Sequence, residues 1–192
     1  MTHKLLTYLL EGGGLALAAR GTWFAWMQWT AYRDSQAARA AVSGRKEIAE
    51  ALKELRYNTP ANYAHIIRVH NGGGDLKAGL PMFMTCVYEA CDTDRPPLRG
   101  TIAGIEIDDH YREMVAELLR VKDAAAEVSK VDDALLKDIL TMMGAKYGRS
   151  ILIKVNRDGI YFLRTTSSTE PLDSPESNIH FRKAVSVLRK LY

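Results

Sequence analysis

The sequence predicts an α+β fold, in which an antiparallel β-sheet is flanked by helices and preceded by a hydrophobic N-terminal helix. Two pairs of strand-like segments are each close enough in sequence to form a hairpin, which favours an antiparallel sheet. Segments with helical periodicity stand before, between and after these pairs. Hydrophobic residues make up 47% of the 192 residues and charged residues 26%, an ordinary balance for a globular protein.

The N-terminal helix is expected from residues 12–31, which contain a single charge, Arg20. The segment is about as long as a membrane-spanning helix, which needs about 20 residues. Three tryptophans stand three residues apart near its end, as in an interfacial anchor: Trp23, Trp26 and Trp29. Three consecutive glycines at its start would allow close helix packing: Gly12, Gly13 and Gly14. We therefore predict that residues 1–33 form a membrane or assembly helix.

Arg20 weakens a simple membrane span, because a central arginine costs about 2.5–3.5 kcal/mol on insertion scales. Helix association would let Arg20 face an interior, and an amphipathic helix on a membrane or against a partner protein is the alternative. Basic residues follow the segment, among them Arg33 and Arg45. The positive-inside tendency then places the C-terminal domain in the cytoplasm. Without a membrane, the protein is expected in the cytoplasm or within a protein assembly.

Residues 34–57 are expected to form a connector and entry helix. Ile48, Leu52 and Leu55 repeat at helical spacing with charged residues between them. Pro60 ends this element, since the residue before proline avoids the helical conformation. The predicted organisation is thus residues 1–33, residues 34–57, and an α+β domain at 58–192.

The first strand pair is predicted at residues 63–70 and 82–90, with a short extended piece at 101–107. The connection between the two strands, HNGGGDLKAGLP, is rich in glycine. It lacks the Lys-Ser/Thr pair and the following helix of a phosphate-binding loop, so we interpret it as a long hairpin connection.

The second half predicts two helices, a hairpin and a last helix. Asp108 or Asp109 caps a helix over residues 110–128, and Asp132 or Asp133 opens the next, which ends near Gly144. ILIKV, NRDG and IYFLRTT then form a hairpin. Ser174 and Pro175 begin the last helix, whose expected buried residues are Ile179, Ala184, Val187, Leu188 and Leu191.

These segments resemble the GAF/PAS group of sensor domains, the GAF type most closely, over residues 46–192. The resemblance rests on ALKELRY, IIRVHNGG, MTCVYEA, LRGTIAGIEI and the closing order of helix, ILIKV, NRDG, IYFLRTT and helix. HNGG followed by a strand ending in YE is also similar to small phage and bacterial proteins with a membrane helix and a GAF-like domain. The resemblance implies a pocket and a tendency to dimerise. Neither cysteine matches a bilin-attachment position, so no cofactor is named.

Candidate ligand-binding residues flank the glycine-rich connection or the space between sheet and helices: Arg68, His70, Tyr88, Glu89 and Tyr111. A buried Glu89 needs a partner, and Arg68 on the neighbouring strand is the expected one. That pairing would make both residues structural.

Catalytic and metal sites are not predicted. Cys86 and Cys91 are five apart and would point to opposite faces of a continuous strand, and metal-binding spacings are absent. A Cys–His pair with His70 remains open, because such partners meet in space. The net charge of +3 is too even to indicate a nucleic-acid partner.

We therefore expect a membrane-anchored, oligomeric, non-catalytic GAF-like sensor or scaffold of phage or mobile-element origin. The alternative is a structural subunit of a protein assembly or channel whose N-terminal helices pack together. A thiol- or metal-dependent enzyme is the third hypothesis. The expected partners are further copies of the chain, a membrane and a small-molecule ligand.

Overall fold

The computed structural model describes the backbone of residues 2–192 and the side chains of residues 23–30, 32–36 and 42–192. The chain divides into two compact units, Met1–Arg45 and Lys46–Tyr192. The first unit consists of helix α1, which spans Thr2–Tyr57 and continues into the second unit. The surroundings of Gly12, Gly13, Gly14 and Arg20 lie outside what the structure describes.

The described tryptophans of α1 are exposed. Trp23, Trp26 and Trp29 have exposed fractions of 60%, 54% and 58%, and the Trp23 and Trp26 rings lie 5.3 Å apart. Among the residues that the structure describes, no helix combines the length and apolar character needed to cross a membrane. The membrane role of residues 12–31 therefore stays a prediction.

The second unit is built on a six-stranded antiparallel sheet in the order β3-β2-β1-β6-β5-β4. The strands are β1 (Tyr63–His70), β2 (Phe83–Cys91), β3 (Ala103–Glu106), β4 (Asp123–Glu127), β5 (Tyr147–Asn156) and β6 (Gly159–Ser167). Both predicted hairpins are present, β1–β2 and β5–β6. The predicted antiparallel sheet flanked by helices is therefore confirmed.

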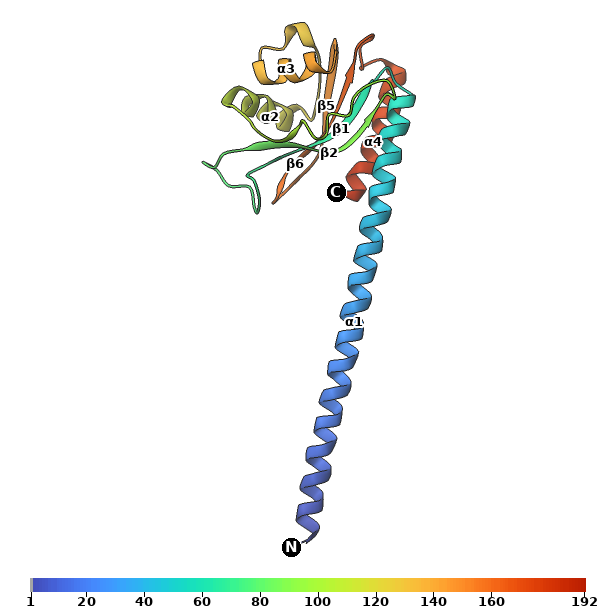
Figure 1. Ribbon diagram of the computed structural model, residues 1–192, viewed down its shortest axis with the longest axis vertical. Helices are drawn as coiled ribbons and strands as arrows, with labels where there is room; N and C mark the ends of the chain where they lie inside the picture. Colours follow the sequence, from blue (N-terminus) through green and yellow to red (C-terminus); the bar gives the residue numbers. More distant parts are fainter. Residues whose placement is uncertain (1) are drawn as a thin grey trace. The chain divides into compact units, whose positions relative to one another are not determined.

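Helices cover both faces of this sheet (Figure 1). Residues 46–57 of α1 and helix α4 (Pro175–Leu191) pack on one face through Leu52, Leu55, Phe181 and Leu188. Helices α2 (Asp109–Val121) and α3 (Ala134–Met142) lie on the other face, beside the short helix η1 (Val128–Lys130). Since β3 and β4 are opposite edges of the sheet, the chain crosses this second face between them by way of α2.

The predicted helix over residues 110–128 is wrong in its second half. Helix α2 ends at Val121, Lys122 adopts a left-handed backbone with φ 67°, and residues 123–127 form edge strand β4 against β5. Its sequence, DAAAE, has weak strand propensity. Hydrogen bonding to a neighbouring strand overrides that propensity here.

The predicted helix caps are confirmed. The Asp108, Asp133 and Ser174 side chains accept backbone hydrogen bonds at the starts of α2, α3 and α4, and Gly144 has φ 63° just after α3. The predicted burial of Ile179 is wrong, because its side chain is 66% exposed. Phe181 and Val185 are buried on α4, together with Ala184 and Leu188.

A β-bulge in β2 alters the predicted face of one cysteine. Ile66 and Ile67 of β1 pair with Tyr88 and Cys86, so Val87 is an extra residue in the ladder. Cys86 consequently lies in the core under α2 and α3, and Cys91 packs against the same core. The predicted opposite orientation of the two cysteines is wrong.

Candidate ligand cavity

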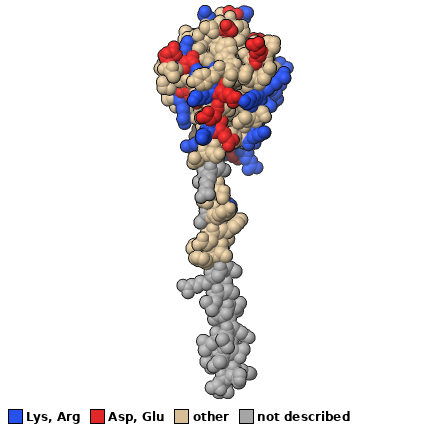
Figure 2. Space-filling model, turned by 90° about the vertical axis from the view of Figure 1, so that its right-hand side faces the viewer, with Lys and Arg blue, Asp and Glu red and all other residues tan. Residues whose placement is uncertain are grey.

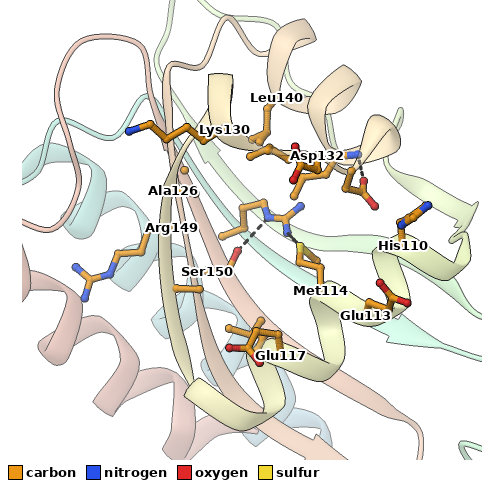
Figure 3. A pocket seen from close by; sticks show the side chains of 17 residues that line it. His110, Glu113, Met114, Glu117, Ala126, Lys130, Asp132, Leu140, Arg149 and Ser150 are labelled. Atoms are coloured by element: carbon orange, nitrogen blue, oxygen red, sulfur yellow. Dashed lines mark hydrogen bonds between the residues drawn. The ribbon is translucent and has the colours of Figure 1, made fainter.

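A cavity of about 490 Å³ opens between α2, α3 and the sheet (Figure 3). Its walls come from α2, from residues 130–133 and from α3, and its floor from β4, β5 and β6. Apolar side chains form much of the lining: Met114, Leu118, Ala124, Ala126, Val131, Leu136 and Leu140. The volume falls within the range of about 300–1,000 Å³ that small-molecule sites have.

Arg164 of β6 forms the charged part of the floor. Alternation along this central strand places Arg164 on the same face as Ile160 and Phe162, which belong to the core under α2 and α3. The residue is only 3% exposed. Its Nε donates to Ser150 Oγ at 3.3 Å, its Nη1 to Tyr111 Oη at 3.1 Å, and its Nη2 contacts Met114 Sδ at 3.7 Å. Figure 3 shows Ser150 and Met114 in the lining of the cavity.

The partners of Arg164 in the described part of the chain are neutral. The guanidinium also lies 5.7 Å from the Tyr111 ring centroid and 5.2 Å from that of Phe162. No described carboxylate comes within ion-pair distance of it. A buried charge without a countercharge is costly, by several kcal/mol even after relaxation. The cavity therefore contains a buried guanidinium that has no ion-pair partner among the described residues.

Arg149 of β5, the neighbouring arginine, shows the ordinary arrangement. Its guanidinium points away from the cavity to the opposite face of the sheet (Figure 3). There it binds both carboxylate oxygens of Asp123 at 2.9 and 2.7 Å and donates to Asn178 Oδ1. It also lies 4.4 Å from the Phe181 ring centroid. Arg149 thus has an ion-pair partner within the protein, whereas Arg164 has none among the described residues.

Asp133 brings a second buried polar group to the lining. Its Oδ1 caps α3 by accepting from Leu136 N, whereas its Oδ2 is buried without a hydrogen-bond partner in the described part of the chain. The residue is 9% exposed. Burial raises the pKa of the Tyr111 hydroxyl; the Arg164 charge opposes this rise and the Asp133 charge adds to it. Arg164 and Asp133 therefore act on the same hydroxyl.

The mouth of the cavity has an acidic bias. Exposed lining residues include Glu113, Glu117 and Asp132, against Lys130 and the ring of His110. Glu117 is engaged by Arg120 on the same helix. The mouth thus favours a ligand with a positive group over one with several negative charges.

The predicted pair of Arg68 with Glu89 is wrong. Arg68 binds Asp158 in the β5–β6 turn, with 3.2 Å between Nη2 and Oδ2, and donates to the Asp158 carbonyl. Glu89 instead contacts His65 Nε2 at 2.9 Å and accepts from the backbone N–H groups of Leu98 and Arg99. Glu89 stands opposite His65, three residues from Arg68 along β1, and the bulge in β2 turns Glu89 to the other face of the sheet from Arg68.

The remaining predicted ligand residues are dispersed. Tyr111 is buried beside the cavity and bonds Arg164. Tyr88 packs in the core under α1 and α4, on the other face of the sheet. His70 lies at the end of β1, where Nε2 meets Thr85 Oγ1 at 2.9 Å and Nδ1 accepts from Gly72 N. Burial, with the nearby Arg68 charge, lowers the pKa of His70. The structure thus brings only Tyr111 to this cavity, and the binding roles stay predictions.

The cysteines do not line the cavity. Burial raises the pKa of the Cys86 thiol to about 12 and also raises that of Cys91. Across the residues with described side chains, no cluster of three His, Cys, Asp or Glu could hold a metal ion.

On the face of the molecule that Figure 2 shows, Lys and Arg are interspersed with Asp and Glu. That pattern differs from the continuous basic patch typical of nucleic-acid binding.

Sequence reasoning missed Arg164, although a signal was present. In GIYFLRTTS the face that carries Ile160 and Phe162 continues with an arginine, in a strand with apolar residues on both faces. A charge on the inner face of a central strand indicates a buried ion that needs a partner. Asp133 was recognised only as a helix cap.

Comparison with known proteins finds similar folds among solved structures. No family model matches the chain, and no curated protein matches it. Among solved structures, the phycoerythrobilin-bound GAF domain of a cyanobacterial phytochrome is similar with a TM-score of 0.54 and 16% identity, over 82% of this chain and 92% of that one. The GAF domain of a Bacillus halodurans two-component sensor histidine kinase gives 0.55 and 10%, over 77% and 91%.

The unit Lys46–Tyr192 has a GAF-like fold. The Thermosynechococcus elongatus PixJ GAF domain, in its blue-light absorbing form, is also similar, with a TM-score of 0.54, 13% identity and coverage of 79% and 88%. The resemblance found in the sequence is thereby confirmed at the level of the fold. Identities this low show the fold alone.

Proposed function

We propose that this protein is a non-catalytic sensor whose GAF-like domain binds a small organic molecule in the cavity between α2, α3 and the sheet. The carrying observation is the buried guanidinium of Arg164, which has no ion-pair partner among the described residues, on the floor of an otherwise largely apolar cavity of about 490 Å³. The bilin-bound GAF domains among the similar structures support a ligand-binding role for this fold. Neither cysteine lines the cavity, so the proposed ligand is not held through sulfur.

The test blocks the cavity with a matched pair of variants on β4. Ala124 is exposed toward the cavity, opposite Ser150, whereas the next residue, Ala125, pairs with Arg149 and does not line it. Ala124→Phe should fill the cavity, and Ala125→Phe should leave it open. Native mass spectrometry of protein purified from cells should show a retained small molecule in wild type and Ala125→Phe but not in Ala124→Phe. Equal retention in both variants, or none in wild type, contradicts the proposal.

We further propose that α1 supplies membrane anchoring and oligomerisation, with the GAF-like domain in the cytoplasm. Support comes from the exposed aromatic side chains at residues 23–32 and the basic residues that follow. A phage or mobile-element origin is the setting that the sequence resemblance suggests. Replacing Trp23, Trp26 and Trp29 by Gln should move the protein from the membrane fraction to the supernatant. A wild-type protein found wholly in the supernatant contradicts anchoring.

A further inference from the structure

Two buried groups of opposite charge line the same cavity without neutralising each other. Arg164 has only neutral hydrogen-bond partners, and Asp133 Oδ2 has none, among the described residues. The two side chains are 3% and 9% exposed. They do not form an ion pair with each other. Each is therefore unsatisfied in the protein alone, although a countercharge stands in the same cavity.

Arg164 fits a carboxylate. A guanidinium offers five N–H donors in a planar fork that matches two carboxylate oxygens. Ser150 and Tyr111 take one donor each at hydrogen-bond distance, and the contact with Met114 Sδ at 3.7 Å is a weak one. Donors remain for an anion that enters the cavity, and burial strengthens such a bond.

Asp133 Oδ2 fits an ammonium. The other carboxylate oxygen, Oδ1, already accepts a hydrogen bond from Leu136 N at the start of α3, so only Oδ2 is available to a ligand. A charged acceptor that is nine-tenths buried calls for a donor, and a cationic donor compensates its charge as well. Both groups influence the Tyr111 hydroxyl, which places them within electrostatic reach of one small region of the cavity.

The other lining residues determine which side chain and which net charge the ligand can have. Leu118, Leu136 and Leu140 offer an apolar surface beside these polar groups. The acids at the mouth disfavour ligands with several negative charges. We propose that the cavity of the GAF-like domain binds a small zwitterion, an α-amino acid or close relative with a large apolar side chain, with its carboxylate on Arg164 and its ammonium on Asp133. This inference rests on the proposed ligand-binding function of the cavity.

The test compares three probes on the full chain by isothermal titration calorimetry. L-phenylalanine carries both charges, 3-phenylpropanoate lacks the ammonium, and 2-phenylethylamine lacks the carboxylate; L-tryptophan and L-leucine extend the series in side-chain size. An amino acid of this series should bind, and each truncated analogue should bind at least about thirty-fold more weakly, because it leaves one buried charge unpaired. If 3-phenylpropanoate binds as tightly as L-phenylalanine, or if no amino acid of the series binds, the zwitterion proposal is overturned.

Two variants test which residue binds each charged group of the ligand. Asp133→Asn keeps the helix cap, since Asn caps as well as Asp, but it removes the negative charge. It should abolish the preference for L-phenylalanine over 3-phenylpropanoate. Arg164→Gln should abolish the preference over 2-phenylethylamine. Lys154→Gln, an exposed change on β5 outside the cavity, is the control and should change neither. Preferences unchanged in both cavity variants refute the assigned contacts.

Failure of the zwitterion inference can be distinguished from failure of the proposed ligand-binding function. Should native mass spectrometry show a retained molecule that Ala124→Phe excludes, while no amino acid binds, the cavity still binds a ligand and only the zwitterion inference fails. Should wild-type protein retain nothing and bind no probe, both fail. The probe comparison in wild type does not depend on any variant folding.

Discussion

Glu89→Gln is expected to destabilise the GAF-like domain strongly at neutral pH and weakly in acid. The Glu89 carboxylate is 7% exposed and has three partners: His65 Nε2 at 2.9 Å, Leu98 N at 2.8 Å and Arg99 N at 3.0 Å. It thereby attaches the loop after β2 to the sheet. Glutamine can accept from one backbone N–H group, but its amide nitrogen then faces another donor.

The magnitude follows from these partners. A hydrogen bond to a charged group contributes about 1.5–3 kcal/mol to stability, and an orphaned buried donor costs about 1–3 kcal/mol. Glutamine keeps part of the network, so we expect a loss of about 2–4 kcal/mol in the free energy of unfolding at pH 7. Urea denaturation followed by circular dichroism measures this loss.

The pH dependence gives the sharper test. Burial alone would raise the pKa of Glu89, but hydrogen bonds from His65, Leu98 and Arg99 outweigh it and lower the pKa below its usual value. A lowered folded-state pKa stabilises the protein above the unfolded pKa of about 4.3, and this stabilisation is lost as the pH falls through the folded value. The difference between wild type and Glu89→Gln should hold from pH 7 to about 5 and shrink below about 4.3.

A matched control separates this effect from a general change of charge. Glu127 also pairs with Lys130 and Ser129, but at the surface, so Glu127→Gln should leave the denaturation midpoint nearly unchanged. If Glu89→Gln lowers stability by the same amount at pH 4 as at pH 7, the buried carboxylate is not the cause and the reasoning is refuted.

Three further changes test other parts of the fold. Gly159→Ala should destabilise by about 1–3 kcal/mol, measured by urea denaturation, because its new Cβ would lie 2.9 Å from the Val69 carbonyl oxygen; no loss would show that the hairpin relaxes. In native protein, Cys91 should react with a maleimide faster than buried Cys86, and the reverse order would contradict the thiol environments. Arg149→Met should cost about 1–3 kcal/mol by the same denaturation assay, because it removes the guanidinium that donates to the buried Leu172 carbonyl and to Asn178 Oδ1; an unchanged midpoint would contradict this.

Local signals explain which elements the sequence predicts correctly. The β5–β6 hairpin and the capped starts of α2, α3 and α4 depend on short stretches such as NRDG, or on single residues such as Ser174. Strand β4 has no such signal, because its alanines favour a helix in isolation. Its extended form depends on pairing with β5, more than twenty residues away in sequence.

The candidate site was not predicted because it too depends on contacts between segments that are distant in the sequence. The expected pairing of Arg68 with Glu89 required only that they lie on neighbouring strands. The register places them three residues apart along β1, and the extra residue at Val87 turns Glu89 to the other face of the sheet. Arg164 meets its neighbours only across strands and helices. Tyr111, which sequence reasoning did select, contacts it from a helix 53 residues earlier.

The corrected register also explains why Arg164 has no ion-pair partner on the neighbouring strands of the sheet. Glu89, His65, Arg164 and Ser150 stand opposite one another on successive strands β2, β1, β6 and β5, so that they form one row across the sheet. Glu89 is the only acid of this row, and its oxygens are engaged by His65 and by the loop after β2. Its negative charge thus stabilises the sheet and the loop after β2, two strands away from Arg164. The guanidinium of Arg164 is left facing Ser150, Tyr111 and the cavity, where a bound carboxylate would complete the row.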